Sequence, residues 1–288
     1  VFTRVAASHI RVGTFVYFAI RGDTQGVQCL ADHVLERHYP EIDTQAADRY
    51  VQLFTAICRK QAELIAWWMQ LGFVHGVMNT DNMTVSGEGI DYGPCAFLES
   101  YRANAVFSSI DQHGRYAFIN QPSIAQWNLA RLAETLLQLF DSNEQTAIEI
   151  AKEILSQFAH WQHEAWLKHM RAKLGFAHQH DGDEALILQL LQILEAGEVD
   201  YSLFMRRLSL LTHKEADRQP VLALAQADQH AALHQWLDTW QELLFEQQES
   251  KSAAERIRAH SPAIIPRNHR VAEAIAAAEA AVANQGKA

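Results

Sequence analysis

A long helical pattern gives way at Gly72 to a stretch of turn-forming residues, and this change limits the folds open to the chain. Apolar residues recur every three or four positions through residues 45–71, and Gly72 can supply the left-handed residue that ends many helices. Beyond it, strand-like pieces at residues 83–85 and 89–91 flank a turn rich in Gly and Ser. The sequence therefore predicts a small sheet inserted between helices.

The loops around this small sheet carry two acidic residues. Asp81 is followed at once by Asn82, and Asp91 comes ten positions after Asp81 in an Asp-Tyr-Gly turn. A carboxylate and an amide oxygen suit Mg²⁺, which takes its remaining oxygens from phosphates and water. The other carboxylate could orient or deprotonate a hydroxyl group. The structural alternative for Asp81 is an Asx turn or a helix cap, because Asn-Thr-Asp-Asn also suits such turns.

The order of these groups is similar to that of a protein kinase, in which a catalytic loop precedes an Asp-aromatic-Gly motif. It differs in detail, because kinases place the Asn five residues after the catalytic Asp. The run HGVMNTDNM followed by IDYGPCAFLE instead resembles the signature of the selenoprotein O family of kinase-like protein adenylyltransferases. Further similar segments cover nearly the whole chain: TRVAASHIRVGTF, GRYAFINQPSIAQWNLARLAETL and IIPRNHRVAEAI.

The helical patterns predict a mainly α fold with a minor β element. The family resemblance implies that this is the larger lobe of a protein-kinase-like fold with appended helices. It implies one domain over residues 1–288, the C-terminal lobe, with a helical extension from about residue 141. In this family AMP is transferred from ATP to a Ser, Thr or Tyr hydroxyl group of a protein. Asp81 is then the proton acceptor, and Asn82 and Asp91 hold Mg²⁺, or Mn²⁺ in its place.

Arg4 and Arg11 are seven residues apart and would share a face of one helix. Two guanidinium groups on one face can clamp a phosphate, whereas two surface arginines on a half-buried helix are the simpler interpretation. The resemblance favours the clamp, because the family carries two ATP-contacting arginines in this arrangement. It also implies that the nucleotide is bound flipped relative to kinases, so that the α-phosphate is the electrophile.

The resemblance also indicates which parts of the family this chain lacks. The smaller lobe, with its glycine-rich loop and nucleotide-binding Lys, is expected before Val1, and the C-terminal cysteine or selenocysteine segment is expected after Ala288. The chain is therefore predicted to be a fragment with little transferase activity alone. Two alternatives for the function stay open: a protein kinase, and an inactive kinase-like binding module.

The composition narrows the range of partners. A formal net charge of −10 argues against nucleic acid, whose binding requires clustered Lys and Arg. No apolar run reaches the roughly 18–20 residues of a membrane span. We therefore expect a cytoplasmic protein that binds neither nucleic acid nor a membrane, and the family resemblance implies that its partners are ATP and protein substrates. The three cysteines, Cys29, Cys58 and Cys95, fit reduced, mostly buried thiols. The histidine pairs His160/His163 and His178/His180 lack the acidic or cysteine partners of a metal site.

Several further expectations concern local structure. His75 should have a structural hydrogen-bonding role, Tyr92 should pack, and Gly93 should let the backbone turn after Asp91. Arg267-Asn268-His269 fits a helix N-terminus capped by Asn268. Helices are expected over residues 24–38, 45–71, 123–140, 143–174, 183–195, 201–212, 230–246 and 268–283.

Overall fold

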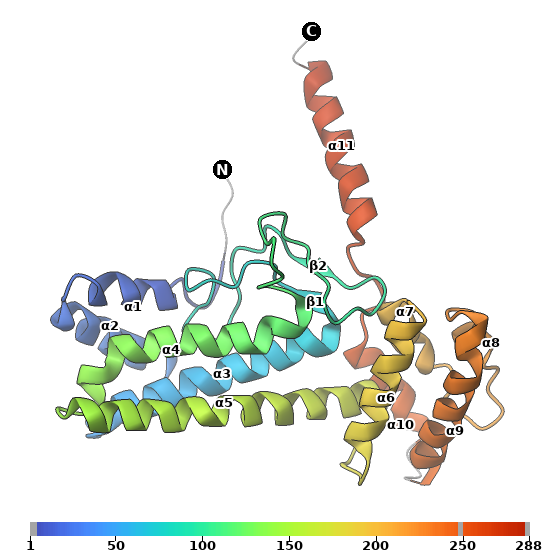
Figure 1. Cartoon of the computed structure of the whole chain (residues 1–288), viewed down its shortest axis with the longest axis horizontal. Coiled ribbons are helices and arrows are strands. Elements are labelled where there is room, and N and C mark those ends of the chain that lie inside the picture. The colour runs from blue at the N-terminus through green and yellow to red at the C-terminus, as the bar shows by residue number, and fades with distance from the viewer. Residues whose placement is uncertain (1–4, 247–249, 286–288) are drawn as a thin grey trace. The chain divides into compact units, whose positions relative to one another are not determined.

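The structure, a computed structural model, describes residues 5–246 and 250–285. Most of these residues lie in α-helices, which confirms the mainly α fold predicted from the sequence (Figure 1). No helix among them is long and apolar enough to cross a membrane. The chain forms two compact units. The first unit consists of Val1–Met69, His75–Pro94 and Ser108–Leu167, and the second of Gln70–Val74, Cys95–Phe107 and Lys168–Ala288.

Three long helices run side by side in the first unit (Figure 1). The rings of Phe54 and Phe140 lie 5.6 Å apart, and the guanidinium group of Arg59 stacks 4.3 Å from the ring of Trp161. These contacts join the helix over residues 49–71 to the helices over residues 121–140 and 144–173. The helices of this unit are α1 (Val12–Ala19), α2 (Thr24–His38), α3 (Arg49–Leu71), α4 (Gln121–Phe140) and α5 (Glu144–Lys173), with a 3-10 turn at Phe118–Asn120.

The ends of these helices follow ordinary capping chemistry. The Asp23 side chain accepts a hydrogen bond of 2.8 Å from the backbone N–H of Gly26, which confirms the predicted start of α2. Gly72 has φ of 71° and ends α3, as predicted. However, α3 begins at Arg49 rather than at residue 45. Asp43 accepts the N–H of Gln45 in a local turn, which keeps this stretch out of the helix.

The sheet is not the one that the sequence predicts. Within the described residues, the paired strands are β1 (Phe73–Val74) and β2 (Ala96–Phe97), which are antiparallel. The predicted strands at residues 83–85 and 89–91 make one isolated bridge, between Met83 and Gly89. Because β1 pairs with β2, the two ends of the intervening segment are held together.

Buried tryptophans form much of the core of the second unit. Trp236 and Trp240 stack with ring centroids 6.0 Å apart, and their indole N–H groups donate to the carbonyl oxygens of Leu186 and Leu174. Both side chains are fully buried, as large aromatic residues with satisfied polar groups can be. The helices of this unit are α6 (Asp183–Ala196), α7 (Tyr201–Leu208), α8 (Gln219–Leu222), α9 (His230–Glu246), α10 (Ser250–His260) and α11 (Asn268–Gln285).

The sequence misplaces some of these elements. It overlooks α8 and α10, and it extends α7 four residues too far, to residue 212. Asn268 is the first residue of α11 rather than its cap, because the N–H of Val271 donates to the carbonyl oxygen of Arg267. Arg267 therefore occupies the capping position.

A lysine is fully buried in this unit. Lys173 Nζ donates to the carbonyl oxygen of His260 at 2.9 Å and to Gln70 Oε1 at 3.3 Å. Burial lowers the pKa of Lys173 to about 7, because the charged form loses its hydration.

We expect Lys173→Met to raise the free energy of unfolding at pH 7 by about 1–3 kcal/mol. The pKa of this lysine is about 7 when folded and 10.5 when unfolded, so the unfolded chain binds more protons between these pH values. The wild-type chain therefore gains stability as pH rises through this window. Chemical denaturation at pH 7 and pH 10 should show the advantage of the variant shrinking toward pH 10. An equal difference at both pH values would contradict the lowered pKa.

Candidate functional site

The segment between β1 and β2 folds back on itself and carries the candidate carboxylates. Its bridge pairs Met83 with Gly89, and Gly87 turns the chain with φ of 82°. Asp81 and Asn82 come just before this bridge on one arm, and Ile90 and Asp91 come just after it on the other. The hairpin therefore brings together the two arms on which the sequence predicts the acid, the amide and the second acid.

Side chains from three helical regions hold the backbone of this hairpin. Because it has little regular pairing, its buried backbone groups need other partners. Tyr39 Oη donates to the carbonyl oxygen of Val85 at 2.5 Å, and Gln61 Nε2 donates to that of Thr84 at 2.6 Å. From α4, Asn128 Nδ2 donates to the carbonyl oxygen of Met78 at 2.9 Å. These anchors fix the position of the loop.

His75 links the start of the segment to the residue before Asp91. Its side chain is fully buried, its Nε2 lies 2.9 Å from the carbonyl oxygen of Ile90, and its Nδ1 accepts the N–H of Val77. Burial lowers the pKa of His75, which favours the neutral ring with its proton on Nε2. The backbone N–H of His75 in turn donates to Gln121 Oε1 at 3.0 Å. The predicted structural hydrogen-bonding role of His75 is thus confirmed.

The turn after this contact occurs at Asp91 itself. Asp91 has φ of 63°, in the left-handed region that few residues other than glycine adopt, and its side chain is exposed. Gly93 lies in a turn with Pro94 just after Asp91, as predicted, but Gly93 does not have a positive φ, so the left-handed residue here is Asp91. Tyr92 packs as predicted, with its ring 5.5 Å from that of His75. Backbone strain of this kind is concentrated at functional sites.

Asn82 is oriented by a hydrogen bond inside the loop. Its side chain is buried, and Nδ2 donates to the carbonyl oxygen of Val77 at 2.9 Å. This bond uses the nitrogen end of the amide and leaves Oδ1 as the ligand atom. Within the part of the chain that the structure describes, no group of three or more His, Cys, Asp and Glu side chains could hold a metal. An amide oxygen such as that of Asn82 and a carboxylate such as that of Asp91 are ligand types that Mg²⁺ takes, with phosphate and water commonly completing its shell.

Asp81 lies at the tip of an Asx turn and against the start of α1. Its backbone N–H donates to Asn79 Oδ1 at 3.0 Å, so the turn that the sequence offered as an alternative is present. The side chain that accepts this hydrogen bond is that of Asn79, however, and not that of Asp81. The Asp81 carboxylate is exposed. A Cβ atom added at Gly13 would lie 2.1 Å from Asp81 Oδ1. Glycine is therefore required at position 13 if the carboxylate is to stay in place.

The segment before α1 is extended and paired with the hairpin. The N–H of Val85 donates to the carbonyl oxygen of Ile10, and the N–H of Val12 donates to that of Met83, both at 3.0 Å. This pairing replaces the predicted helix, so Arg11 has extended φ and ψ of −115° and 163°. Residues 5–11 therefore form no helix, so Arg11 does not lie on the helical face that the sequence predicts. Arg4 lies outside the described residues.

Arg11 nevertheless reaches the candidate site. Its Nη1 donates to the carbonyl oxygen of Asp81 at 3.2 Å, which places the guanidinium group beside the acid and amide. Its Nε is buried and has no hydrogen-bond partner among the described residues. A buried N–H without an acceptor is unfavourable by about 1–3 kcal/mol, and a phosphate oxygen could satisfy it.

We expect Gly13→Ala to lower nucleotide transfer by about 100-fold without unfolding the chain. The new methyl group must displace the Asp81 carboxylate, whereas the backbone of Gly13 suits alanine. Gly93→Ala is the matched control, because a Cβ atom there meets nothing within 4 Å. Thermal unfolding and transfer rates of both variants give the comparison. Equal rates for the two would show that the position of Asp81 does not matter.

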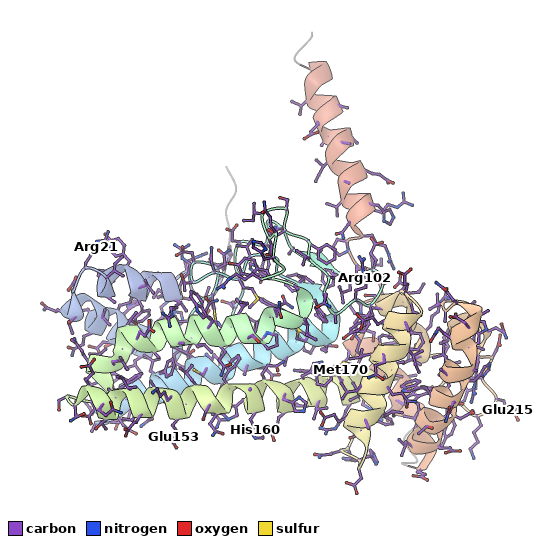
Figure 2. The ribbon with its side chains drawn as sticks, in the orientation of Figure 1. Arg21, Arg102, Glu153, His160, Met170 and Glu215 are labelled. Atoms are coloured by element: carbon purple, nitrogen blue, oxygen red, sulfur yellow. The ribbon has the colours of Figure 1, made fainter. Side chains whose placement is uncertain are left out.

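The other candidates from the sequence do not form a site. The three cysteines are free; Cys58 is buried, but Cys29 is exposed and Cys95 is partly exposed, so the expectation of mostly buried thiols is wrong. His160 contacts Glu164 at 3.3 Å and points away from α3 and α4 (Figure 2). This agrees with a surface role.

Comparison with known proteins identifies similar sequences. The model of the family described as protein adenylyltransferase SelO matches residues 1–285. The chain is 52% identical over 281 residues to a protein nucleotidyltransferase YdiU of Rhizobium johnstonii, covering 96% of this chain and 55% of the relative. It is 50% identical over 279 residues to the protein of the same name in Geobacillus kaustophilus, covering 96% and 56%. The chain thus spans about half the length of these curated relatives.

Proposed function

Because the chain belongs to the family of the protein adenylyltransferase SelO, we propose that it carries the catalytic groups of a Mg²⁺-dependent enzyme that transfers AMP from ATP to protein hydroxyl groups. The observation that carries the proposal is the hairpin with Asp81 and Asn82 on one arm and Asp91 on the other. We further propose that residues 1–288 belong to the larger lobe of a kinase-like fold, with a helical extension from about residue 141.

In the proposed reaction, an oxygen of a Ser, Thr or Tyr side chain forms a bond to the α-phosphorus of ATP. The bond from that phosphorus to the oxygen bridging the α- and β-phosphates breaks, and pyrophosphate leaves. Asp81 accepts the proton of the hydroxyl group. Its carboxylate is exposed and lies against Gly13, and its backbone is set by an Asx turn, which supports this role.

Asn82 and Asp91 are the proposed ligands of Mg²⁺, or of Mn²⁺ in its place. The bound cation supplies positive charge that balances charge on the phosphates. The buried hydrogen bond of Asn82 keeps its Oδ1 available, and the left-handed backbone at Asp91 sets the direction of its carboxylate. The Asn82 oxygen is therefore kept in position before a ligand arrives.

Arg11 is the proposed contact of this chain with the phosphates of ATP, together with Arg4. The guanidinium group of Arg11 is held beside Asp81, and its Nε lacks an acceptor among the described residues. A planar guanidinium group can bind two phosphate oxygens at once. This supports a role for Arg11 in holding the α-phosphate of ATP near the Asp81 carboxylate.

Arg11→Lys should weaken ATP binding by about tenfold, because lysine keeps the charge but loses the planar pair of donors. Arg21→Lys is the control, since Arg21 is exposed and follows the far end of α1 (Figure 2). Titration of fluorescent ATP with Mg²⁺ present measures both variants. Equal affinities in the two variants would remove Arg11 from the nucleotide site.

The activity can be tested in a chimera in which this chain replaces the matching segment of the Rhizobium johnstonii relative. With ATP labelled at the α-phosphate, the proposal predicts label on protein acceptors. Label transferred only from the γ-phosphate would identify a protein kinase. Transfer of neither label, with the relative itself active in the same assay, would identify a kinase-like binding module.

A further inference from the structure

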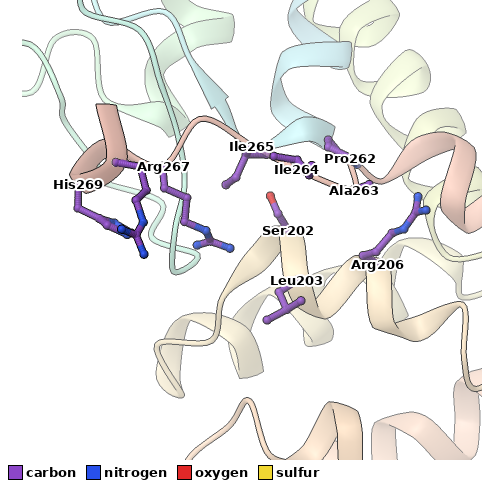
Figure 3. Close-up of a pocket in the computed structure, with 10 residues that line it drawn as sticks. Ser202, Leu203, Arg206, Pro262, Ala263, Ile264, Ile265, Arg267 and His269 are labelled. Atoms are coloured by element: carbon purple, nitrogen blue, oxygen red, sulfur yellow. The ribbon is translucent and has the colours of Figure 1, made fainter. Parts of the chain in front are cut away.

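A pocket in the second unit lies between the start of α7 and the segment that leads into α11 (Figure 3). Its volume is about 630 Å³, within the range of sites that hold small ligands or a few peptide side chains. All of its lining residues belong to the second unit, and none belongs to the hairpin. It therefore shares no lining residue with the site proposed for transfer.

The pocket is cationic in an otherwise acidic chain. Arg206, Arg267, Arg270 and His269 line it, and no Asp or Glu is among the described residues that do so. Carboxylates outside the lining contact three of these side chains, and Glu99 lies 3.3 Å from His269, whereas Arg206 has no carboxylate partner among the described contacts. The chain as a whole has a net charge of −10. This contrast favours an anionic ligand.

Each of the three guanidinium groups has a hydrogen-bond or ion-pair partner, although the Arg270 side chain is largely exposed. Arg206 Nη1 donates to two carbonyl oxygens, those of Arg258 at 2.9 Å and Ser261 at 3.0 Å. Arg267 Nη1 lies 2.6 Å from Asp200 Oδ2, and Arg270 Nη1 lies 2.8 Å from Glu273 Oε2. These contacts all use Nη1, and a guanidinium group has five N–H donors, so each retains donors for a ligand.

A buried hydroxyl group adds a second, independent indication of a ligand. Ser202 is 5% exposed, and its Oγ is buried without a hydrogen-bond partner among the described residues. Figure 3 shows this hydroxyl directed toward the segment with Ile264 and Ile265, across the pocket. Leaving such a group unpaired is unfavourable, and an acceptor atom on a ligand would satisfy it.

The remaining lining is aliphatic rather than aromatic. Ile264 is 89% exposed, and Leu203 and Ile265 lie beside it on the pocket wall. A nucleotide base usually stacks on an aromatic ring, and no Phe, Tyr or Trp is among the described lining residues. An exposed isoleucine beside arginines instead suits a ligand that joins an aliphatic group to a carboxylate.

We propose that this pocket is a docking site for a protein segment in which an acidic residue stands next to a Leu, Ile or Val side chain. The carboxylate binds the guanidinium groups and the Ser202 hydroxyl, and the aliphatic side chain covers Ile264. The charge of the pocket and its exposed isoleucine select this partner. Docking requires no nucleotide and no transfer, so it can fail or succeed independently of the adenylyltransferase activity.

Selection from a phage-displayed library of random heptapeptides on the 288-residue chain tests the proposal. We expect enriched peptides with Asp or Glu beside an aliphatic residue. The best peptide, labelled with fluorescein, should bind at least tenfold more weakly to Arg270→Gln and to Ile264→Ser, both changed at exposed positions. Arg258→Gln is the control, because Arg258 is exposed, does not line the pocket, and loses the same charge.

Three outcomes would overturn the proposal. Peptides of basic or purely apolar sequence would exclude the stated partner, and equal binding to Arg270→Gln and Arg258→Gln would place the docking elsewhere. Inorganic phosphate or ATP that displaces the labelled peptide at micromolar concentration would make the pocket a site for small phosphates. Circular dichroism of each variant verifies that the helices are retained.

Discussion

Asp91→Asn is expected to lower AMP transfer by the chimera about 1,000-fold, which corresponds to about 4 kcal/mol of transition-state stabilisation. The substitution removes the only charged ligand proposed for the cation. Asparagine keeps the size of the side chain and tolerates the left-handed φ of 63° at this position. Loss of activity therefore cannot be attributed to backbone strain. Initial rates with labelled ATP, measured over a range of Mg²⁺ concentrations, give the effect.

Tyr92→Phe is the matched control for this experiment. It alters the next residue of the same turn and keeps the ring that packs 5.5 Å from His75. Its rate should stay within about threefold of wild type. If Asp91→Asn keeps a similar rate, Asp91 is not a metal ligand.

Asp81→Asn is expected to separate binding from chemistry. Transfer should fall by about 1,000-fold, because the amide cannot accept the proton of the acceptor hydroxyl group. Affinity for ATP with Mg²⁺ should change by less than about twofold, since Asp81 acts on the acceptor rather than on the nucleotide. Arg11 bonds to the backbone carbonyl of Asp81, so its position does not depend on the carboxylate.

Isothermal titration of ATP, run beside the rate measurement, distinguishes two roles for Asp81. If Asp81→Asn weakens ATP binding as much as Arg11→Lys does, then Asp81 belongs to the nucleotide site. The assignment of Asp81 as the base would then be wrong.

Helices with strong periodicity and clear end signals could be predicted from the sequence. The cap at Asp23 and the left-handed Gly72 fixed two boundaries correctly, and α9 has the predicted bounds of residues 230–246. Short helices such as α8 were missed because four residues carry no detectable period. The sheet was misplaced because two residues per strand leave no alternation to recognise.

The turn between the two arms that carry the acids could also be predicted, but the supports of this segment could not. Gln61 and Asn128 lie on helices and Tyr39 directly follows one, all far away in the sequence. Their partners are backbone carbonyl groups, which have no sequence signature. Likewise, Arg11 precedes an apolar run that suits a helix. Tertiary pairing of its neighbours with the hairpin overrides that local preference.

The most direct test of the account is a crystal structure of the chimera with Mg²⁺ and a non-hydrolysable ATP analogue. The account predicts a cation about 2.1 Å from an Asp91 carboxylate oxygen and from Asn82 Oδ1. It also predicts a phosphate group on Arg11, with the α-phosphate as the phosphate nearest to Asp81. A nucleotide bound away from the hairpin, or a cation that touches neither Asn82 nor Asp91, would contradict it.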